Sequence, residues 1–432
     1  MSCILPKQQK NLFSKLLYLL IPTFLSGGAF YLLSSTLPLY LTRELANGGL
    51  AWKEEKAFPL LGTYFALSYL APLLGGLLSD KLLGNFWTTF LSLFLSLLGL
   101  CTSLTTPSPE ILVPSLYMFS LGTGLTKLCL TSAVNNYSKG IKIQYRGFDI
   151  FYIFTCLGFI LGHFLSFPIF SRFGFYTIVF LSIFCLFLSI VFLLQSPLPY
   201  HHSKTFSSAP KKDTPPLEKI SILSFALLHL LALPFFILST QLNSSLSIFV
   251  DRYVFRTLSF GEFPVSWFAA IGSLTMIFYV SLRNRSLKNL PKKYLNNNWS
   301  QMTFAFFLLG ISFVLLSIYA FELIPLPTPL SITYIFLTYL GIFIADSHVR
   351  PTLWSSASQY IPPSYQAIAI ACSYLTIGLG TELGGLWAKT LHSQNFSWFF
   401  LINSFVALTF TKILILKALS NKRLHKKIVL LK

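Results

Sequence analysis

Long apolar stretches constrain what this chain can fold into more than any other feature of the sequence. Twelve stretches come near the ~20 residues that an α-helix needs to cross the hydrocarbon core of a bilayer. Of the 432 residues, 54% are hydrophobic and 10% are charged, whereas an average soluble domain has about 25% charged residues. This composition excludes a soluble enzyme, a nucleic-acid-binding module and a disordered regulator, because the exposed apolar surface would aggregate. The sequence predicts an all-α membrane protein with helices over residues 17–41, 58–78, 87–105, 111–134, 148–170, 174–195, 220–242, 264–282, 301–321, 329–349, 364–386 and 397–416.

The net charge of +19 is explained by where the basic residues lie. If the N-terminus is cytoplasmic, most of the 32 lysines and arginines fall in cytoplasmic segments, as the positive-inside rule requires. We therefore interpret the charge as membrane topology with both termini in the cytoplasm, and we expect no nucleic-acid partner. Abundant phenylalanine, lysine and asparagine favour an AT-rich bacterial genome, so the expected location is the plasma (inner) membrane.

The longest polar interruption, residues 196–219, is rich in proline, serine and lysine and reads as a cytoplasmic linker. Six apolar stretches precede it and six follow. We therefore expect an N-terminal six-helix bundle over residues 1–195 and a C-terminal bundle with a basic cytoplasmic tail over residues 220–432. Paired bundles commonly hold a substrate site near the membrane midplane. The alternative is a membrane scaffold or membrane enzyme that transports nothing.

The segment that follows the second apolar stretch contains a recognisable pattern. Residues 75–84 read Gly-Gly-Leu-Leu-Ser-Asp-Lys-Leu-Leu-Gly, which resembles the G-x-x-x-D-(R/K)-x-x-G loop of the major facilitator superfamily. The resemblance implies the major facilitator fold, in which Asp80 stabilises a helix N-terminus and Lys81 faces the cytoplasm. We assign Asp80, Lys81 and Asp149, which lies at the edge of a predicted helix, to gating or conformational roles. An ordinary tight turn is the alternative.

Further segments resemble the proton-dependent oligopeptide transporter (POT/PTR) family of that superfamily. Residues 69–84 match its helix 2 pattern, and residues 121–127, Leu-Gly-Thr-Gly-Leu-Thr-Lys, look like its helix 4 segment G-x-G-x-x-K-P. Residues 148–158 are similar to its F-x-x-F-Y-x-x-x-N-x-G signature, and residues 267–274 follow its W-F-x-x-x-N-P-L. The resemblance implies secondary transport of di- or tripeptides, or of a similar small zwitterion, by alternating access.

The first helix departs from that family. Where the family has Glu-x-x-Glu-Arg, this chain has Thr23, Ser26 and Gly27. In the family this motif helps to link proton and peptide, so proton symport is left as a hypothesis here. The main alternative is a divergent carrier that moves an amino acid or another metabolite without proton coupling.

Two ionisable residues inside predicted helices carry the binding hypothesis, because charges in a bilayer are expensive and usually functional. Lys127 matches the family's helix 4 lysine, which pairs with the helix 1 glutamate or approaches the peptide carboxylate. The alternative for Lys127 is a side chain that extends to the membrane surface. Asp346, five residues before Pro351, lies where the family has a helix 10 glutamate associated with the peptide amino group. A cation in one bundle and an anion in the other suit a zwitterion. For Asp346 the alternative is a pair with His348 or Arg350.

Four further polar residues are candidates on weaker grounds. Tyr31 matches a cavity tyrosine of the family, and Gln241 belongs to a Q-x-x-S pattern of its helix 7; helix packing explains either residue equally well. Glu382 and Asp346 are the candidate proton carriers. For His229, which has no family match, we expect helix–helix hydrogen bonding, with a proton relay as the alternative.

The sequence shows no pattern that requires a cofactor. None of the six cysteines has metal-ligand spacing, and no nucleotide-binding loop or catalytic motif occurs in a credible context. We therefore expect a transporter rather than an enzyme, with no metal and no cofactor. The expected partners are a small zwitterionic solute or short peptide, protons and the lipid bilayer, and we expect a monomer.

Overall fold

A computed structural model describes most of the chain. The described residues are 7–105, 108–138, 144–196, 219–259, 261–286, 298–321, 328–361, 366–390 and 396–430. Most of the predicted linker, residues 197–218, lies outside them.

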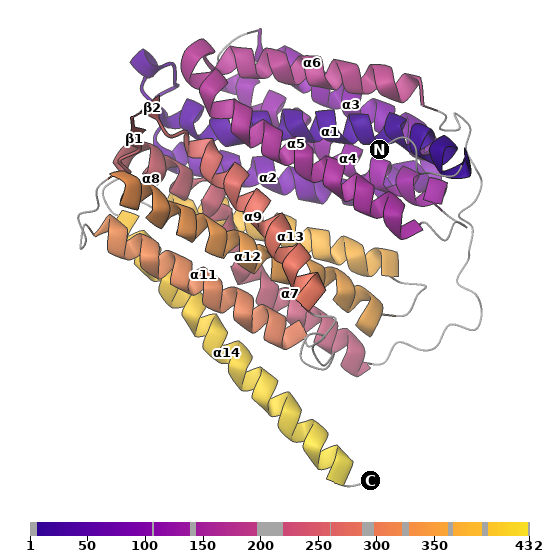
Figure 1. Ribbon diagram of the computed structural model, residues 1–432, viewed down its shortest axis with the longest axis vertical. Helices are drawn as coiled ribbons and strands as arrows, with labels where there is room; N and C mark the ends of the chain where they lie inside the picture. The colour runs from indigo at the N-terminus through magenta and orange to yellow at the C-terminus, as the bar shows by residue number, and fades with distance from the viewer. Residues whose placement is uncertain are drawn as a thin grey trace. The chain divides into compact units, whose positions relative to one another are not determined.

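The described chain is almost entirely helical (Figure 1). The helices are α1 (Lys7–Thr42), α2 (Glu54–Leu77), α3 (Gly84–Ser103), α4 (Pro109–Ser138), α5 (Gln144–Phe173), α6 (Phe175–Leu194), α7 (Lys219–Ser239), α8 (Ser245–Tyr253), α9 (Val265–Ser286), α11 (Asn298–Ala320), α12 (Thr328–Tyr360), α13 (Gln366–Lys389) and α14 (Phe396–Leu430). A short antiparallel hairpin, β1 (Thr257–Leu258) and β2 (Gly261–Glu262), joins α8 to α9 and pairs Thr257 with Glu262.

Within the described residues, eleven helices are long and apolar enough to cross a membrane, and Val265–Tyr279 is a shorter apolar helix. These twelve coincide with the twelve predicted stretches, so the all-α architecture is confirmed. Helices dominate because a bilayer offers no partner for an unpaired peptide group. The outer surface agrees with a lipid environment, since Phe180, Phe184 and Phe187 share one face of α6 and are each more than half exposed.

The chain forms two compact units. Unit 1 comprises Met1–Ala51 and Thr63–Ala209, and unit 2 comprises Trp52–Gly62 and Pro210–Lys432. The sequence pattern gave no sign that the first part of α2 would group with the second half of the chain.

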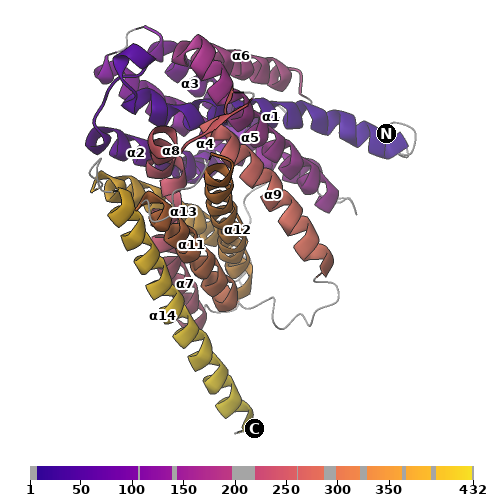
Figure 2. The same cartoon turned by 60° about the vertical axis from the view of Figure 1, so that its left-hand side comes forward.

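Within each unit the helices pack in a regular way. In unit 1, α1 packs against α5 and α6, and α3 packs against α4. In unit 2, α11 packs against both α12 and α14, while α13 packs against α7. Figure 2 shows α14 continuing past the ends of the other helices of unit 2.

Two local breaks differ from the sequence expectation. The predicted loop after the second helix is a π-helical segment, Leu78–Leu83, that continues α2. It ends at Gly84, whose φ of 76° is strained for other residues and lets α3 begin in a new direction. The seventh predicted span does not stop at residue 242. It passes through a 3-10 turn, Thr240–Asn243, into α8.

Candidate functional site

Lys127 lies on α4 inside a group of aromatic rings in unit 1. Its Nζ is 4.7 Å from the ring centre of Phe30, 5.6 Å from that of Tyr31 and 5.9 Å from that of Tyr69. We call these four residues the aromatic cage. The rings come from α1 and α2, and their faces attract a cation. The lysine is half-buried, so the ammonium is held inside the unit rather than extended into bulk water.

The second face of Tyr31 packs against α5. Its ring centre is 4.2 Å from that of Phe159 and 5.3 Å from that of His163. Thr23 lies on the same helix, α1, at a position where the resembled family has a glutamate. The Thr23 hydroxyl donates to Leu19 O at 2.8 Å. Tyr31 is therefore held by an edge-to-face contact with Phe159 and a tilted contact with His163, while the Thr23 hydroxyl bonds to its own helix.

Asp346 lies on α12 in unit 2 and forms an ion pair with Arg350. Arg350 Nε donates to both carboxylate oxygens, at 2.8 Å to Oδ1 and 2.6 Å to Oδ2. The Asp346 side chain is 21% exposed and that of Arg350 is 26% exposed. The guanidinium carbon of Arg350 is 5.5 Å from the ring centre of Phe236. The structure thus shows one of the two pairings that the sequence left open as alternatives. A ligand ammonium would have to share or replace Arg350.

Gln241 lies in the 3-10 turn between α7 and α8 and is fully buried. Its Nε2 donates to Ile237 O at 3.1 Å and to Gly384 O of α13 at 3.0 Å. Its Oε1 accepts from Ser245 at 2.8 Å and from Ser244 at 3.3 Å. Both amide protons are used, and Oε1 accepts from Ser245, while the single hydroxyl proton of Ser244 can go to Oε1 or to Thr240 O at 3.2 Å. In this structure the side chain fastens the break in the helix to α13.

The gating candidates are described only through their backbone. Asp80 and Lys81 lie in the π-helical segment, and Asp149 lies in the first turns of α5; their side chains are outside the described part of the chain. Glu382 lies half-buried on α13. Near it, Gly385 meets Gly62 so closely that a Cβ at Gly62 would lie 2.8 Å from Gly385 Cα.

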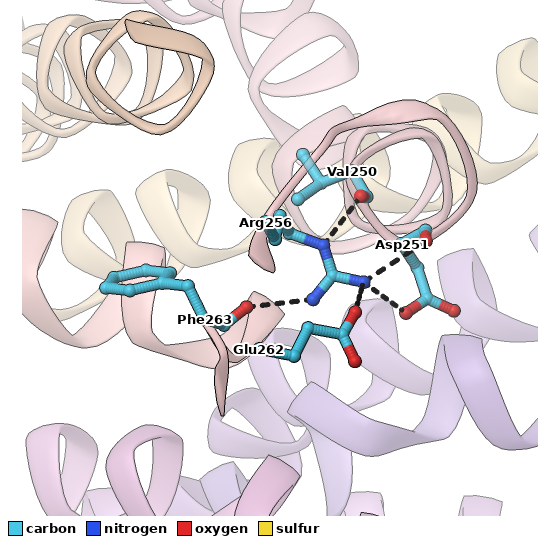
Figure 3. Close-up of polar contacts among 5 residues, drawn as sticks. All are labelled: Val250, Asp251, Arg256, Glu262 and Phe263. Carbon is cyan, nitrogen blue, oxygen red and sulfur yellow. Dashed lines mark hydrogen bonds and ion pairs between the residues drawn. The ribbon is translucent and has the colours of Figure 1, made fainter. Parts of the chain in front are cut away.

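A charged network closes the end of unit 2 that contains the hairpin (Figure 3). Arg256, 3% exposed, donates from Nε to Val250 O at 3.0 Å and from Nη1 to Phe263 O at 2.8 Å. Its Nη2 contacts Asp251 Oδ1 at 3.1 Å and Glu262 Oε1 at 2.7 Å. These bonds join α8, the hairpin and the short segment between the hairpin and α9 through one guanidinium.

A second ion pair lies beside that network. Arg252 of α8 pairs with Glu54 at the start of α2, and both residues belong to unit 2. Elsewhere, among the described residues, no group of three or more histidine, cysteine, aspartate or glutamate side chains is arranged to hold a metal ion.

The profile of the major facilitator superfamily matches residues 19–385, which is most of the chain. The chain belongs to the major facilitator superfamily. The resemblance seen in residues 75–84 is thereby confirmed, and the protein is a multi-pass membrane protein of that superfamily.

The chain is also similar to individual transporters within that superfamily. A di-/tripeptide transporter of Lactococcus lactis subsp. lactis is 33% identical over 121 residues, which are 28% of this chain and 24% of the relative. The matched region is thus about a quarter of that protein's length. A crystal structure of the peptide transporter POT with sulfate covers 95% of both chains at 19% identity, with a TM-score of 0.82. A POT family transporter in complex with 5-aminolevulinic acid covers 93% of this chain and 95% of its own, at 18% identity and a TM-score of 0.80. At these identities the structures show a shared fold.

Several residues of this superfamily member were beyond the reach of sequence reasoning. Phe30 and Tyr69 carry no signal as lysine partners, because aromatic residues are common throughout apolar helices. Asp346 is the exception, because its spacing of four residues from Arg350 on a helix made that pair one of the alternatives named from the sequence, and the structure shows it. Glu54 and Arg252 are 198 positions apart, so only folding shows that they pair.

Proposed function

We propose that the chain is a secondary carrier of the proton-dependent oligopeptide transporter family that moves di- or tripeptides by alternating access. The supporting observation is Lys127: its place matches the family's helix 4 lysine, and the aromatic cage holds its ammonium in a membrane-spanning helix. Sequence similarity to a di-/tripeptide transporter and a fold shared with peptide transporters point to the same branch.

Each end of the substrate has a complementary charge in this proposal. Lys127 receives the carboxylate of the peptide, and Tyr31 beside it offers a ring face and a hydroxyl. In unit 2, Asp346 receives the amino group. Because its carboxylate is bonded to Arg350 at 2.6 Å, the ammonium takes over one oxygen while Arg350 keeps the other. Gln241 can bind the amide groups of the peptide only if its own hydrogen bonds within the protein rearrange.

The test compares substrates that lack one charge. Purified protein in proteoliposomes is assayed with dialanine, with dialanine amide, which lacks the carboxylate, and with N-acetyl-dialanine, which lacks the ammonium. Lys127→Ala should raise the KM for dialanine about tenfold or more, since a hydrogen bond to a charged group is worth about 1.5–3 kcal/mol. The same variant should leave the KM for the amide unchanged.

The matched control is Lys56→Ala. Lys56 is an exposed lysine whose Nζ is 3.9 Å from the ring centre of Trp52, so it has the same ring contact outside the proposed site. If both lysine variants impair dialanine uptake equally, the ammonium of Lys127 has no special role. Absence of any peptide uptake or competition would remove the proposal altogether.

Asp346 is tested by contrast with its partner. Asp346→Asn should raise the KM for dialanine and not that for N-acetyl-dialanine, whereas Arg350→Gln leaves the carboxylate in place and should not raise the KM. Equal effects of the two variants on every substrate would show that the ion pair only stabilises α12.

A small zwitterionic metabolite is the second candidate. The observation that favours it is the bound 5-aminolevulinic acid of one structural neighbour, which has an amino group and a carboxylate on a short chain. Under this alternative, a small zwitterionic metabolite or an amino acid is the transported substrate, and it competes with dialanine for uptake. Its transport is either coupled to protons or independent of them. A substrate panel read by thermal shift separates the candidates, because a ligand that binds the folded state raises the melting temperature.

The remaining features of the proposal concern topology and coupling. We place the carrier in a bacterial inner membrane as a monomer, with both termini cytoplasmic and with residues 1–195 and 220–432 as the two six-helix bundles. Asp80, Lys81 and Asp149 contribute to the conformational change. Proton symport, with Asp346 and Glu382 as candidate carriers, is tested by peptide accumulation with and without an inward pH gradient.

A further inference from the structure

His229 of α7 is held at the edge of an apolar cavity in unit 2. The cavity has a volume of about 580 Å³ and is lined by α7 and α13, with Phe225, Cys372 and Thr376 among its walls. His229 lines it as well and is 7% exposed. One edge of the imidazole is therefore reachable from the cavity, while the rest of the ring is buried.

Both ring nitrogens have defined partners. Nδ1 is 2.9 Å from Phe225 O, and Nε2 is 2.9 Å from Ser373 Oγ of α13. A carbonyl oxygen can only accept, so Nδ1 carries a proton. In the neutral ring Nε2 then has a free lone pair, and the Ser373 hydroxyl donates to it. Among the residues that the structure describes, no acidic side chain bonds to this imidazole and would hold it permanently charged.

The hydroxyl of Ser373 has two other acceptors within reach. Its Oγ is 3.4 Å from Ala369 O on the same helix and 3.5 Å from Leu353 O on α12. One hydroxyl proton cannot serve Nε2 and a carbonyl at once. Two arrangements of the same heavy atoms are therefore available, and they differ only in where the protons lie.

We propose that the His229–Ser373 pair is a proton-binding site. A proton that arrives through the cavity bonds to the Nε2 lone pair, and the imidazole becomes an imidazolium. The Ser373 O–H turns from Nε2 to the carbonyl of Ala369 or Leu353, and Nε2–H then donates to the Ser373 oxygen. No bond between heavy atoms forms or breaks, and every polar hydrogen keeps an acceptor in both states.

Other titratable groups near α7 leave this site separate. On α13, Cys372 lines the same cavity and Glu382 is roughly two and a half turns beyond Ser373. On α12, Tyr360 packs against the cluster of Phe225, Ala357 and Ala369. Also on α12, His348 contacts Tyr279 of α9 and Gln301 of α11 through its two ring nitrogens. Asp346 and Arg350 pair with each other, and Arg350 lies over Phe236, roughly two turns from His229.

The other two helices that pack against α7 add one titratable side chain each among those that the structure describes. Tyr319 of α11 contacts Phe249, twenty positions along the chain from His229, and Lys412 of α14 is exposed. Protonation of His229 therefore acts on the hydrogen bond between α7 and α13 and, through Leu353, on α12. Given the peptide transport proposed above, this site supplies a proton coupling that the first helix, with Thr23 and Ser26, does not provide.

The first experiment does not depend on any substrate. The full-length protein, which has seven histidines, is labelled with ¹⁵N-histidine in nanodiscs, and the His229 signals are assigned by their loss in His229→Gln. We expect Nδ1–H with unprotonated Nε2 at high pH, and two protonated nitrogens at low pH. Ser373→Ala should move the Nε2 signal and the titration midpoint.

Two controls make this result specific. Ser356 donates to the same carbonyl, Leu353 O, at 2.6 Å, so Ser356→Ala removes a neighbouring hydroxyl without touching the ring. His163→Gln removes another buried histidine, whose Nδ1 is 3.1 Å from Phe159 O. Neither should move the His229 signals. An Nε2–H signal at high pH, a ring that stays unchanged over the whole pH range in which the protein remains folded, or equal shifts in Ser356→Ala and Ser373→Ala would overturn the proton site.

The second experiment tests coupling in proteoliposomes. An inward pH gradient should raise dialanine accumulation by the wild type, and in His229→Gln the ratio of uptake with and without the gradient should fall to about 1, while peptide exchange without a gradient continues. A ratio that stays at the wild-type value overturns the coupling role. If the wild type moves no peptide but His229 titrates, the proposed substrate fails and the proton site stands.

Discussion

Most of the hydrogen-bonded polar side chains in the described part of the chain find their partner in one of two ways. Serines and threonines mostly donate to a carbonyl of their own helix, as Thr23 does to Leu19 O. Larger groups reach between helices: Gln241 joins α13, and His229 joins Ser373. The second group matters more for function, because a residue that links two helices changes their packing when its hydrogen bonds change.

Gln241 gives the clearest stability prediction for a single residue. Gln241→Leu should lower the free energy of unfolding by about 2–4 kcal/mol, because it leaves the Gly384 carbonyl and the hydroxyls of Ser244 and Ser245 without this partner. Chemical unfolding in detergent measures the change. Ser239→Ala, which removes one bond of 3.5 Å to Phe236 O, should differ from the wild type by less than about 0.5 kcal/mol. Equal stability of both variants would show that Gln241 does not fasten the helix break.

Helix breaks and close crossings distinguish the elements of this chain from twelve uniform rods. The seventh span continues into α8 after Ser244, whose φ of −128° and ψ of −97° are not helical. α8 then leads into the hairpin held by Arg256. Also within unit 2, α2 and α13 approach through Gly62 and Gly385, which small side chains make possible.

Arg256 should be replaceable by no other cation. Arg256→Lys is expected to lower the free energy of unfolding by about 2 kcal/mol, since an ammonium cannot match the planar set of bonds to Val250 O, Phe263 O and Asp251. Proteolysis of the hairpin, which tests local opening, should also become faster. The comparison is Arg172→Lys at an exposed position, where little change is expected. If the two variants are equally stable, the network in Figure 3 contributes nothing measurable.

The glycine contact between α2 and α13 predicts a steric effect. In Gly62→Ala the new Cβ would lie 2.8 Å from Gly385 Cα and 3.1 Å from Glu382 O, so the helices must separate and about 1–3 kcal/mol of stability is lost. Gly27→Ala makes the same change on α1, where a Cβ meets nothing within 4 Å. Melting temperatures of the two variants in detergent are the measurement. A stable Gly62→Ala protein would contradict the close crossing.

The whole molecule consists of two compact units that do not coincide with two continuous stretches of chain. Trp52–Gly62 groups with unit 2, although the rest of α2 belongs to unit 1. Two contacts account for this grouping: the Glu54–Arg252 ion pair and the Gly62–Gly385 crossing. Helix α2 therefore contributes residues to both units.

The orientation of the chain is tested by reporter fusions. With both termini cytoplasmic, green fluorescent protein fused after Lys432 should fluoresce, because it folds in the cytoplasm. Alkaline phosphatase fused after Leu45, between the first and second helices, should be active, because it needs the oxidising side of the membrane. The reversed pattern would contradict the orientation inferred from the basic residues.

The amino-acid sequence alone was sufficient to predict the membrane-spanning helices. Each of the twelve apolar stretches becomes a helix because every peptide group in lipid must be paired within its own segment, and that requirement is local in the chain. The superfamily, too, was recognisable from short local patterns such as residues 75–84. For the same reason, Lys127 stood out as a cation inside a predicted helix before any contact was known.

Side-chain partners required the folded molecule. Lys127 meets Phe30 and Tyr69 from other helices, and Asp346 chooses Arg350 over His348. Gln241 and His229 find their partners more than 140 positions away. Such contacts depend on how helices rotate and cross, and many rotations bury similar apolar area, so the hydrophobic pattern does not choose among them. The packing of side chains between helices selects one rotation and crossing, and this arrangement determines which partner each polar group meets.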